Sequence, residues 1–371
     1  MNLRIPGPTP CPDPVREALS KQMINHRGKE FGQLINKVTS QLKQLFQTSN
    51  DLFILTGSGT GVMEAAVVNT LSPGDRVLGV CNGFFGERFA DIADIYGAKA
   101  TRLTFEWGTA PDPDAVAKAL KADPSIKAVL VTHNETSTGV TSDLEAIARV
   151  VKGAGKLFIV DAISSIGSID LPVDKWRCDV VVTGSQKGFM VPPGLAFISF
   201  SEEAWRANKE AKMPRNYWDM GKAKSYLARG QTPWTPAVSI FFALDVALDM
   251  MLKEGLPNII ARHQRVGKRT RDGVRSLGLS IFADEKHASN TVTAVEVPEG
   301  LDSKKLLQLL INEYDIELSG GQQRLEGKIF RIGHLGYVNE ADIDGVIDGL
   351  RAALPRIGFK VPTGKRSSRQ G

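Results

Sequence analysis

The alternation of short apolar runs with helical patterns between residues 51 and 200 constrains the fold of this chain more than any other feature. The runs are rich in β-branched and apolar residues and have the length of buried strands, at 52–55, 76–80, 128–131, 157–160 and 180–183. Two stretches between them, 63–71 and 141–151, carry residues that begin and end helices. Strands that alternate with helices are joined by right-handed crossovers. The segment therefore predicts an α/β fold, with a mostly parallel sheet covered by helices on both faces.

The run at 195–200 departs from this pattern, because it follows Pro192-Pro193-Gly194 too soon for a helical crossover. We expect it to pair antiparallel to an earlier strand. Two long helices are predicted next, at 238–252 and 256–277. Beyond them the pattern becomes strand, helix, strand, strand and helix, at 291–297, 303–313, 316–318, 328–332 and 340–353. This change predicts a second, smaller α+β domain.

The length of 371 residues exceeds what one ordinary core accommodates, so we expect two domains and peripheral segments. We predict an N-terminal arm at 1–20, a large domain at 21–255 and a small C-terminal domain at 256–359. A disordered tail is predicted at 360–371, because the run at 365–369 is basic and contains no apolar residue.

Charge and cysteine content argue against several classes of function. The formal net charge of +5 is modest and no basic stripe interleaved with aromatic residues is visible, so we expect no nucleic-acid partner. The three cysteines, Cys11, Cys81 and Cys178, are too widely spaced for a zinc site or a disulfide framework, so no metal is predicted. No apolar run of membrane-spanning length and no leader-like start is visible, so we expect a cytoplasmic protein without a membrane partner.

Ligands of an open α/β sheet bind beyond the carboxyl ends of the strands, so the loops after the apolar runs are the candidate sites. The segment 56–61, Thr-Gly-Ser-Gly-Thr-Gly, leaves a predicted strand and opens a predicted helix. Its glycines admit an anion close to the backbone, and the hydroxyls of Ser58 and Thr60 join free helix amides, as in a phosphate site; a flexible strand-to-helix turn is an equal alternative. A dinucleotide fingerprint does not fit, because Val62 stands where the third glycine is needed.

Two titratable residues follow buried strands. Asp161 ends one run, where an ionised carboxylate needs a cationic or hydrogen-bonding partner such as a pyridinium nitrogen; the alternative is that it caps the following turn. Lys187 follows another run and can act as an amine nucleophile if burial or a neighbouring cation lowers its pKa. The alternative for Lys187 is a solvated loop residue.

Two further segments are candidates for ligand binding. The loop 132–139 is dense in hydrogen-bonding side chains, although His133 and Glu135 could equally belong to the scaffold. Arg331 lies between apolar neighbours on a predicted strand, where a guanidinium needs a bidentate carboxylate from a ligand or from an internal Asp or Glu. A pyridoxal phosphate enzyme needs four such parts: a phosphate site, an acid and a lysine at strand ends, and an arginine from a second domain.

Several segments occur in the order of a known family along nearly the whole chain, up to about residue 359: 6–9, 56–66, 82–88, 132–139, 160–161, 184–187 and 330–336. In these segments the chain resembles the class V aminotransferases of the alanine–glyoxylate, serine–glyoxylate and serine–pyruvate type. The resemblance implies a fold-type I enzyme that binds pyridoxal 5′-phosphate, with a mostly parallel seven-stranded sheet and a smaller α+β C-terminal domain. It also implies a homodimer whose active sites lie at the subunit interface.

The resemblance implies cofactor-binding roles for single residues. Lys187 would join the cofactor as a Schiff base, and Asp161 would pair with its pyridine nitrogen. The phosphate would be held by Ser58, Gly59, Thr60 and Gln186. The ring would be contacted by Phe85, where relatives often have Trp, by Ile163 on the opposite face and by Thr136 at the pyridine hydroxyl.

Substrate and partner roles follow from the same resemblance. Arg331 would bind the substrate carboxylate, Gly7 would contact the substrate, and Thr232 and Thr235 would serve the phosphate bound by the partner subunit. The implied reaction moves the amino group of a small amino acid, alanine or serine, to a 2-oxo acid, glyoxylate or pyruvate, by a ping-pong mechanism. A phosphonate or ureido amino substrate, a lyase reaction and a non-catalytic binding role are alternatives. A desulfurase is disfavoured because no cysteine follows Cys178.

Overall fold

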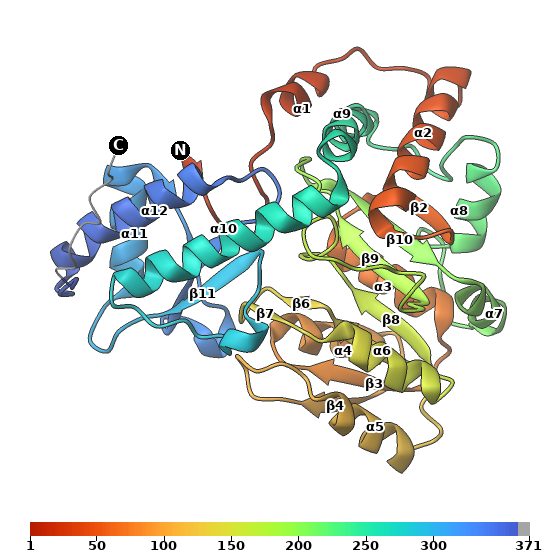
Figure 1. The fold of residues 1–371 in the computed structure, drawn as a ribbon. Coiled ribbons are helices and arrows are strands. Elements are labelled where there is room, and N and C mark those ends of the chain that lie inside the picture. The colour runs from red at the N-terminus through yellow and green to blue at the C-terminus, as the bar shows by residue number, and fades with distance from the viewer. Residues whose placement is uncertain (363–371) are drawn as a thin grey trace.

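The computed structural model describes residues 1–362 and contains a seven-stranded sheet in the order β2-β10-β9-β8-β5-β3-β4 (Figure 1). In that order the strands are Asp51–Gly57, Gly194–Phe200, Val180–Gly184, Leu157–Asp161, Ala128–Thr132, Arg76–Cys81 and Lys99–Thr104. β10 is antiparallel to both of its neighbours, and the other pairings are parallel. The prediction of a mostly parallel sheet, with the run at 195–200 antiparallel, is confirmed.

The apolar runs did not reveal β4, which lies at the edge of the sheet and pairs with β3. Its sequence, Lys-Ala-Thr-Arg-Leu-Thr, exposes Lys99 and Arg102 to solvent. Charged side chains on an edge strand discourage pairing with another chain. The same charges remove the continuous apolar pattern by which the central strands were predicted.

Helices cover both faces of the sheet. On one face lie α2 (Lys29–Phe46), α5 (Pro113–Ala122), α6 (Leu144–Gly153) and α9 (Val238–Glu254), and on the other lie α3 (Gly59–Thr70), α4 (Phe84–Ile95), α7 (Glu202–Glu210) and α8 (Met220–Leu227). Side chains of a strand point alternately to the two faces. In β2, Leu52 and Ile54 join the first core, whereas Phe53 and Leu55 join the second.

Two helix starts differ from the predicted ones. α3 begins at Gly59, earlier than the predicted residue 63, although glycine is a weak helix former. The start is held by Ser58, whose hydroxyl accepts a hydrogen bond from Gly61 N at 3.3 Å. α6 begins three residues later than predicted, because residues 140–141 belong to β7 (Val140–Thr141), which pairs with β6 (Asn134–Glu135).

The C-terminal part packs around a three-stranded antiparallel sheet in the order β11-β14-β13. Its elements are α10 (Leu256–Ser276), β11 (Val292–Glu296), α11 (Ser303–Tyr314), β13 (Ser319–Gly320), β14 (Ile329–Gly333) and α12 (Glu340–Ala353). A hydrophobic core of its own includes residues from Val266 to Leu354. These elements lie close to their predicted ranges. The domain boundaries near residues 20, 255 and 359 remain proposals.

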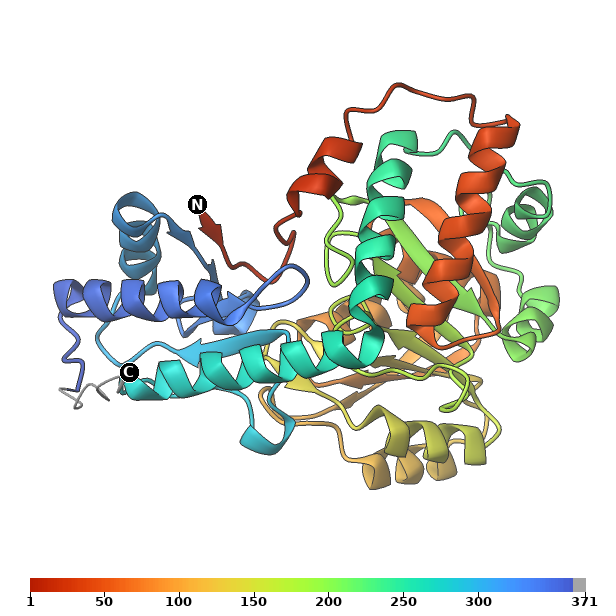
Figure 2. The same ribbon diagram turned by 45° about the horizontal axis from the view of Figure 1, so that its top comes forward.

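The first residues of the chain lie on this C-terminal part (Figure 2). β1 (Asn2–Leu3) pairs in parallel with β12 (Ile316–Glu317), so the strand predicted at 316–318 does not join the three-stranded sheet. The chain then crosses to the large sheet, where α1 (Asp13–Ala18) packs in the core that contains α9. The predicted arm at 1–20 thus contacts both parts of the molecule.

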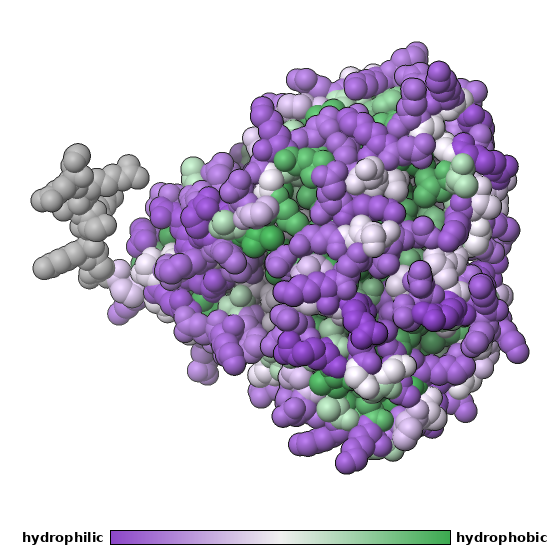
Figure 3. Space-filling model, turned by 45° about the vertical axis from the view of Figure 1, so that its right-hand side comes forward, coloured by the Kyte–Doolittle hydropathy of each residue, from purple (hydrophilic) through white to green (hydrophobic). Residues whose placement is uncertain are grey.

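The remaining elements are short. The 3-10 helices are η1 (Glu285–His287), η2 (Gln323–Leu325) and η3 (Leu354–Ile357). The face drawn in Figure 3 is mainly hydrophilic, with apolar side chains in scattered groups. Within residues 1–362, no helix has the length and apolar character needed to cross a membrane. Residues 363–371 of the predicted tail lie outside the described part of the chain.

Candidate active site

The carboxyl ends of β9, β8 and β5 lie side by side, because these strands are neighbours in the sheet. Asp161 is the last residue of β8 and pairs in register with Thr132 of β5 and Val182 of β9. Lys187 follows β9 by three residues. The strand-end acid and the strand-end lysine therefore lie at the edge of the sheet where α/β proteins bind ligands.

The carboxyl group of Asp161 is almost fully buried, with 3% of the residue exposed. One oxygen accepts a hydrogen bond from Ile163 N at 2.9 Å, and the other accepts from Thr132 Oγ1 at 3.3 Å. Burial raises the pKa of Asp161 to about 7, because desolvation penalises the charged carboxylate more than the Ile163 bond favours it. A cationic group placed beside this carboxyl would stabilise its ionised form.

The amine of Lys187 points toward the N-terminal segment, where Nζ donates a hydrogen bond to the carbonyl of Pro6 at 2.5 Å. Burial and, to a smaller extent, the Arg331 guanidinium lower the pKa of Lys187 to about 8, and Asp161 opposes the change. The three side chains thus interact through their charges in one site. An amine with this pKa is partly unprotonated at neutral pH, as a nucleophile must be.

Arg331 on β14 brings a buried guanidinium to the same site, with 6% of the residue exposed. Nε donates to Gly320 O at 3.0 Å, and Nη1 donates to Thr136 O and to Gln322 Oε1, each at 3.2 Å. Burial lowers the pKa of Arg331 to about 10. Within the described chain, no carboxylate lies in ion-pair distance of this guanidinium, and the buried Glu135 acts on it only from farther away, where its charge raises the pKa of Arg331 against the effect of burial.

The predicted phosphate segment lies at the start of α3. Gly59 is buried, and a Cβ added to it would lie 2.6 Å from Cδ1 of Ile163, so a larger residue would not fit there without displacing Ile163. The hydroxyl of Thr60 accepts a hydrogen bond from Arg88 Nη1 at 3.4 Å. Gln186 lies next to Lys187, and its Oε1 is buried without a hydrogen-bond partner within residues 1–362. The helix amides and the nearby guanidinium suit a phosphate group, whereas the unpaired Gln186 Oε1 is a hydrogen-bond acceptor and needs a donor as its partner.

Phe85 lies in the first turn of α4, and its backbone N–H donates to Glu135 Oε2 at 3.0 Å. The Arg88 guanidinium lies 5.0 Å from the centre of the Phe85 ring. Glu135 is fully buried and also accepts from Gly86 N and from the amide and hydroxyl of Ser137. It therefore fixes the helix start that carries Phe85, which agrees with the scaffold interpretation of Glu135.

The other predicted ring contacts occupy the same region. Ile163 follows Asp161 by two residues and lies against Gly59, between the acid and the phosphate segment. Thr136 is buried, its hydroxyl donates to Ser164 Oγ at 2.7 Å, and its carbonyl accepts from Arg331. Thr136 therefore links the loop after β5 to the arginine of the C-terminal part.

Gly7 lies directly against Lys187. A Cβ at this position would be 2.5 Å from the lysine Nζ, and the backbone has a φ of +137°, which L side chains rarely adopt. Thr9, two residues later, donates from N to Gln186 O and from Oγ1 to Lys187 O. The N-terminal segment thus forms one wall of the site.

Thr232 and Thr235 do not share this geometry. The Thr232 hydroxyl is buried and donates to Trp234 O at 2.7 Å within its own loop, whereas Thr235 is exposed. Thr232 lines a small hollow that includes Thr56, at the end of the strand that precedes the phosphate segment. Their contribution to a partner subunit stays a prediction.

Residue patterns did not single out Trp218 and Gln322 as parts of the site. A Cβ on Gly57 or Gly61 would lie within 2.8 Å of the Trp218 ring, so this tryptophan covers the phosphate segment. Gln322 contacts Arg331 from the loop before β14. Both come from irregular segments, in which no periodicity or motif could reveal the contact, and Trp218 is also far in sequence from Gly57 and Gly61.

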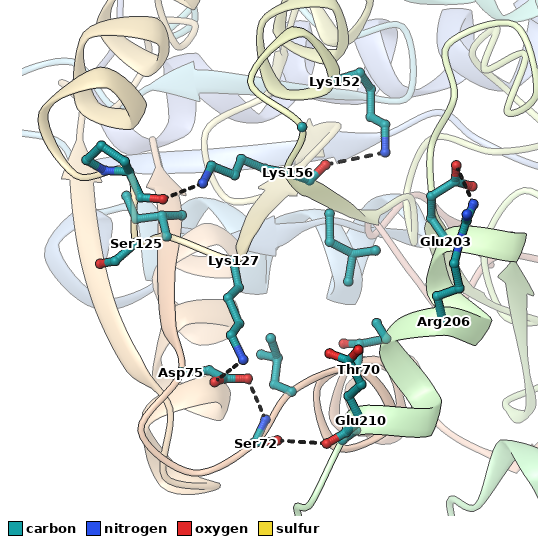
Figure 4. A pocket seen from close by; sticks show the side chains of 17 residues that line it. Thr70, Ser72, Asp75, Ser125, Lys127, Lys152, Lys156, Glu203, Arg206 and Glu210 are labelled. Carbon is teal, nitrogen blue, oxygen red and sulfur yellow. Dashed lines mark hydrogen bonds and ion pairs between the residues drawn. The ribbon is translucent and has the colours of Figure 1, made fainter.

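A separate hollow of about 470 Å³ lies at the opposite, amino ends of β3, β5 and β8 (Figure 4). Its basic side chains already have partners: Lys127 pairs with Asp75, Lys156 donates to the Pro124 carbonyl, and Arg206 pairs with Glu203. It lies away from Asp161 and Lys187, so it is a distinct surface feature. Within residues 1–362, no cluster of His, Cys, Asp or Glu is suited to hold a metal ion.

Comparisons with known proteins show which chains this one is similar to. A family model described as aminotransferase class-V matches residues 5–346. The small subunit of the soluble hydrogenase of Synechococcus sp. is 48% identical over 96% of this chain and 94% of that protein. The serine–glyoxylate aminotransferase of Methylorubrum extorquens is 38% identical over 98% and 93% of the two chains. The crystal structure of pyridoxamine–pyruvate aminotransferase from Mesorhizobium loti superposes with a TM-score of 0.94, at 33% identity over 98% of this chain and 94% of that one.

Proposed function

This chain belongs to the class V aminotransferases, and on that premise we propose that it moves the amino group of alanine or serine to glyoxylate or pyruvate. The proposal is supported by one observation above all. The buried guanidinium of Arg331 has no carboxylate partner within residues 1–362, and it lies within electrostatic reach of the amine of Lys187. An amino acid brings together the two groups that this pair would bind and transform, a carboxylate and an α-amino group.

Enzymes of this family use pyridoxal phosphate, which supplies an aldehyde to receive the amino group and a ring that spreads the charge left after Cα loses its proton. We propose that Ser58, Gly59, Thr60 and Gln186 hold its phosphate. Phe85 and Ile163 would contact the two faces of its ring, and Thr136 would lie near the ring hydroxyl. The close packing of Gly59 on Ile163 supports these roles, because it brings the phosphate segment against a residue proposed to contact the ring.

Lys187 would take the proton from the substrate Cα and deliver it to the cofactor. With a pKa near 8, its amine is able to take the Cα proton and to return a proton later at neutral pH. The Pro6 carbonyl, 2.5 Å from Nζ, orients the amine, and Gly7 leaves room for it. Asp161 would hold a proton on the cofactor ring nitrogen, since an ionised carboxylate in this buried position is stable only beside a positive charge.

The two substrates would bind in turn at the same carboxylate site, which gives ping-pong kinetics. Arg331 would bind the carboxylate of the amino donor first and that of the 2-oxo acceptor second. We further propose a homodimer in which Thr232 and Thr235 serve the partner's phosphate site. A location in the cytoplasm is supported by three cysteines that are all free thiols.

A donor and acceptor panel tests the proposed reaction. With alanine or serine as donor and glyoxylate or pyruvate as acceptor, we expect the corresponding amino and keto acids to form, with parallel double-reciprocal plots. Lys187→Ala should abolish turnover, whereas the exposed Lys209→Ala should leave it unchanged. Absence of turnover with all these pairs, in protein that has bound its cofactor, would rule out these substrates. Pyridoxamine and a ureido or phosphonate amine in the panel would then identify the donor.

A further inference from the structure

The guanidinium of Arg331 is already partly engaged before any substrate binds. Of its five N–H groups, Nε–H is taken by the Gly320 carbonyl and two hydrogen bonds leave Nη1, one to Thr136 O and one to Gln322 Oε1. A carboxylate binds a guanidinium most strongly through two parallel N–H···O bonds. Within residues 1–362, Nη2 of Arg331 donates no hydrogen bond, whereas Nε and Nη1 do. A second parallel bond therefore requires an N–H that a neighbour now holds.

The three neighbours differ in how easily they can release an N–H. Gly320 O belongs to β13, which pairs with β14, and Thr136 O belongs to the buried loop after β5. Withdrawing either carbonyl would require the backbone to move. Gln322 Oε1 belongs to a half-buried side chain, which can rotate away at the cost of one hydrogen bond.

The backbone around Gln322 is fixed from both sides. Gly321 N donates to Ile329 O at 2.9 Å, and the Gln322 carbonyl accepts from Leu325 N at 3.0 Å. Further along, the Arg324 guanidinium lies 3.7 Å from the centre of the Trp107 ring and pairs with Glu87 of α4. The segment is therefore tethered to both parts of the molecule, and the Gln322 side chain is the element that can move alone.

We propose that Gln322 determines how tightly substrates bind, because its side-chain carbonyl occupies Arg331 in the ligand-free enzyme and is displaced by the substrate carboxylate. The inference rests on the proposed function, since it takes Arg331 as the carboxylate site. A neutral amide binds a guanidinium more weakly than a carboxylate does. The substrate carboxylate therefore displaces the Gln322 side chain from Arg331. A permanent carboxylate at this position would keep Arg331 occupied.

The test compares Gln322→Glu with Gln322→Ala, and with Gln308→Glu as a control that adds the same charge to the exposed surface of α11. Gln322→Glu is expected to raise KM for both amino donor and 2-oxo acceptor by about tenfold or more, while kcat changes little. Its ligand-free form should melt at a higher temperature than the wild type, because a buried cation gains a charged partner. Gln322→Ala should lower KM, because no side chain then competes with the substrate for Nη1 of Arg331, and the control should behave as the wild type.

A measurement without turnover separates this inference from the proposed reaction. Propionate, a simple carboxylate, should raise the melting temperature of the wild-type holoenzyme and of Gln322→Ala, but not that of Gln322→Glu. This pattern supports the exchange at Arg331 even if none of the tested amino donors reacts. The inference is overturned if Gln322→Glu binds substrates and propionate as the wild type does, if propionate fails to stabilise the wild type, or if Gln322→Ala raises KM as much as Gln322→Glu.

Discussion

Asp161 is a carboxyl group whose pKa differs strongly between the folded and the unfolded chain. Its usual pKa is 3.8, and burial raises this value to about 7 in the folded, cofactor-free protein. Between these values the folded state binds more protons than the unfolded state does. Its contribution to stability is therefore fully present below pH 4 and is lost as the pH rises toward 7. The strand-end acid is thus costly to keep ionised until a cation is bound beside it.

Asp161→Asn tests how much the ionised carboxylate destabilises the fold, because the amide has a similar shape and does not titrate. Relative to the variant, the cofactor-free wild type should be less stable at pH 8 than at pH 5, by on the order of a few kcal/mol. Thermal melting of both proteins across this pH range is the measurement. Bound cofactor should reduce the difference, because a protonated ring nitrogen would stabilise the ionised acid. Parallel pH profiles of the two cofactor-free proteins would contradict the buried, protonated state of Asp161.

The residues predicted from sequence were those whose setting is visible locally. Asp161 directly follows a continuous apolar run, Lys187 follows another after a short loop, and Arg331 lies between apolar neighbours, so these residues could be selected as candidates without a structure. Gln322 and Trp218 lie in irregular segments, and only tertiary packing brings them to the site. Whether Arg331 pairs with an internal acid depends on the tertiary structure, in which no carboxylate of residues 1–362 lies in ion-pair distance of it.

At the scale of elements, the start of α3 depends on a glycine that packs tightly. Gly59 approaches Ile163 of the loop after β8 so closely that a methyl group would lie 2.6 Å from Cδ1. The helix start and the end of β8 are thereby held in contact. Since the phosphate segment and the ring-binding residues come from these two elements, this contact sets their spacing.

Gly59→Ala is expected to weaken cofactor binding by about tenfold, because the added methyl group pushes Ile163 toward the space proposed for the ring. Folding stability should change little, since alanine favours the helix by about 0.5–1 kcal/mol over glycine and so offsets part of the clash. Absorbance titration with pyridoxal phosphate and thermal melting measure the two effects. Gly153→Ala at the end of α6, where the added Cβ meets nothing within 4 Å, is the matched control. Equal cofactor affinity of the two variants would show that the spacing does not matter.

Elements with strong local signals were predicted to within a few residues, as for α9, α10 and α12. The prediction failed for β4, whose charges suit an edge strand, and for the first turn of α3, whose glycines do not favour a helix. In both cases the tertiary position of the segment outweighs its local preference. The glycines at the start of α3 serve close packing and anion binding instead.

At the scale of the whole molecule, the N-terminal segment ties the C-terminal part to the reactive lysine. β1 pairs with β12, and the carbonyl of Arg4 accepts from Gly333 N at 2.6 Å. A few residues later, Pro6, Gly7 and Thr9 contact Lys187 or its neighbour. Residues 2–3 are too few for a sequence pattern to predict a strand, so this link could only be found in the structure.

Arg4 anchors the segment at its far end. Its side chain is 6% exposed and pairs with Asp342 in the first turn of α12 at 2.9 Å. Asp342 is 29% exposed, so solvent weakens the pair, but the Arg4 side chain also donates to Asn2 and to the Tyr337 carbonyl. Removing the guanidinium breaks several contacts between the first residues and the C-terminal part. The walls of the active site that come from residues 6–9 should then be held less firmly.

Arg4→Met is therefore expected to lower the free energy of unfolding by about 1–2 kcal/mol and to reduce turnover at temperatures where the protein remains folded. Arg16→Met removes an exposed ion pair with Asp13 from the same N-terminal region and should change neither property, because exposed pairs contribute little. Melting curves and kcat measured on the same samples give both quantities. If Arg4→Met lowers stability but leaves kcat at the wild-type value, the anchor serves folding alone. A joint loss, absent in Arg16→Met, would mean that the position of Lys187 depends on a contact at the opposite end of the segment.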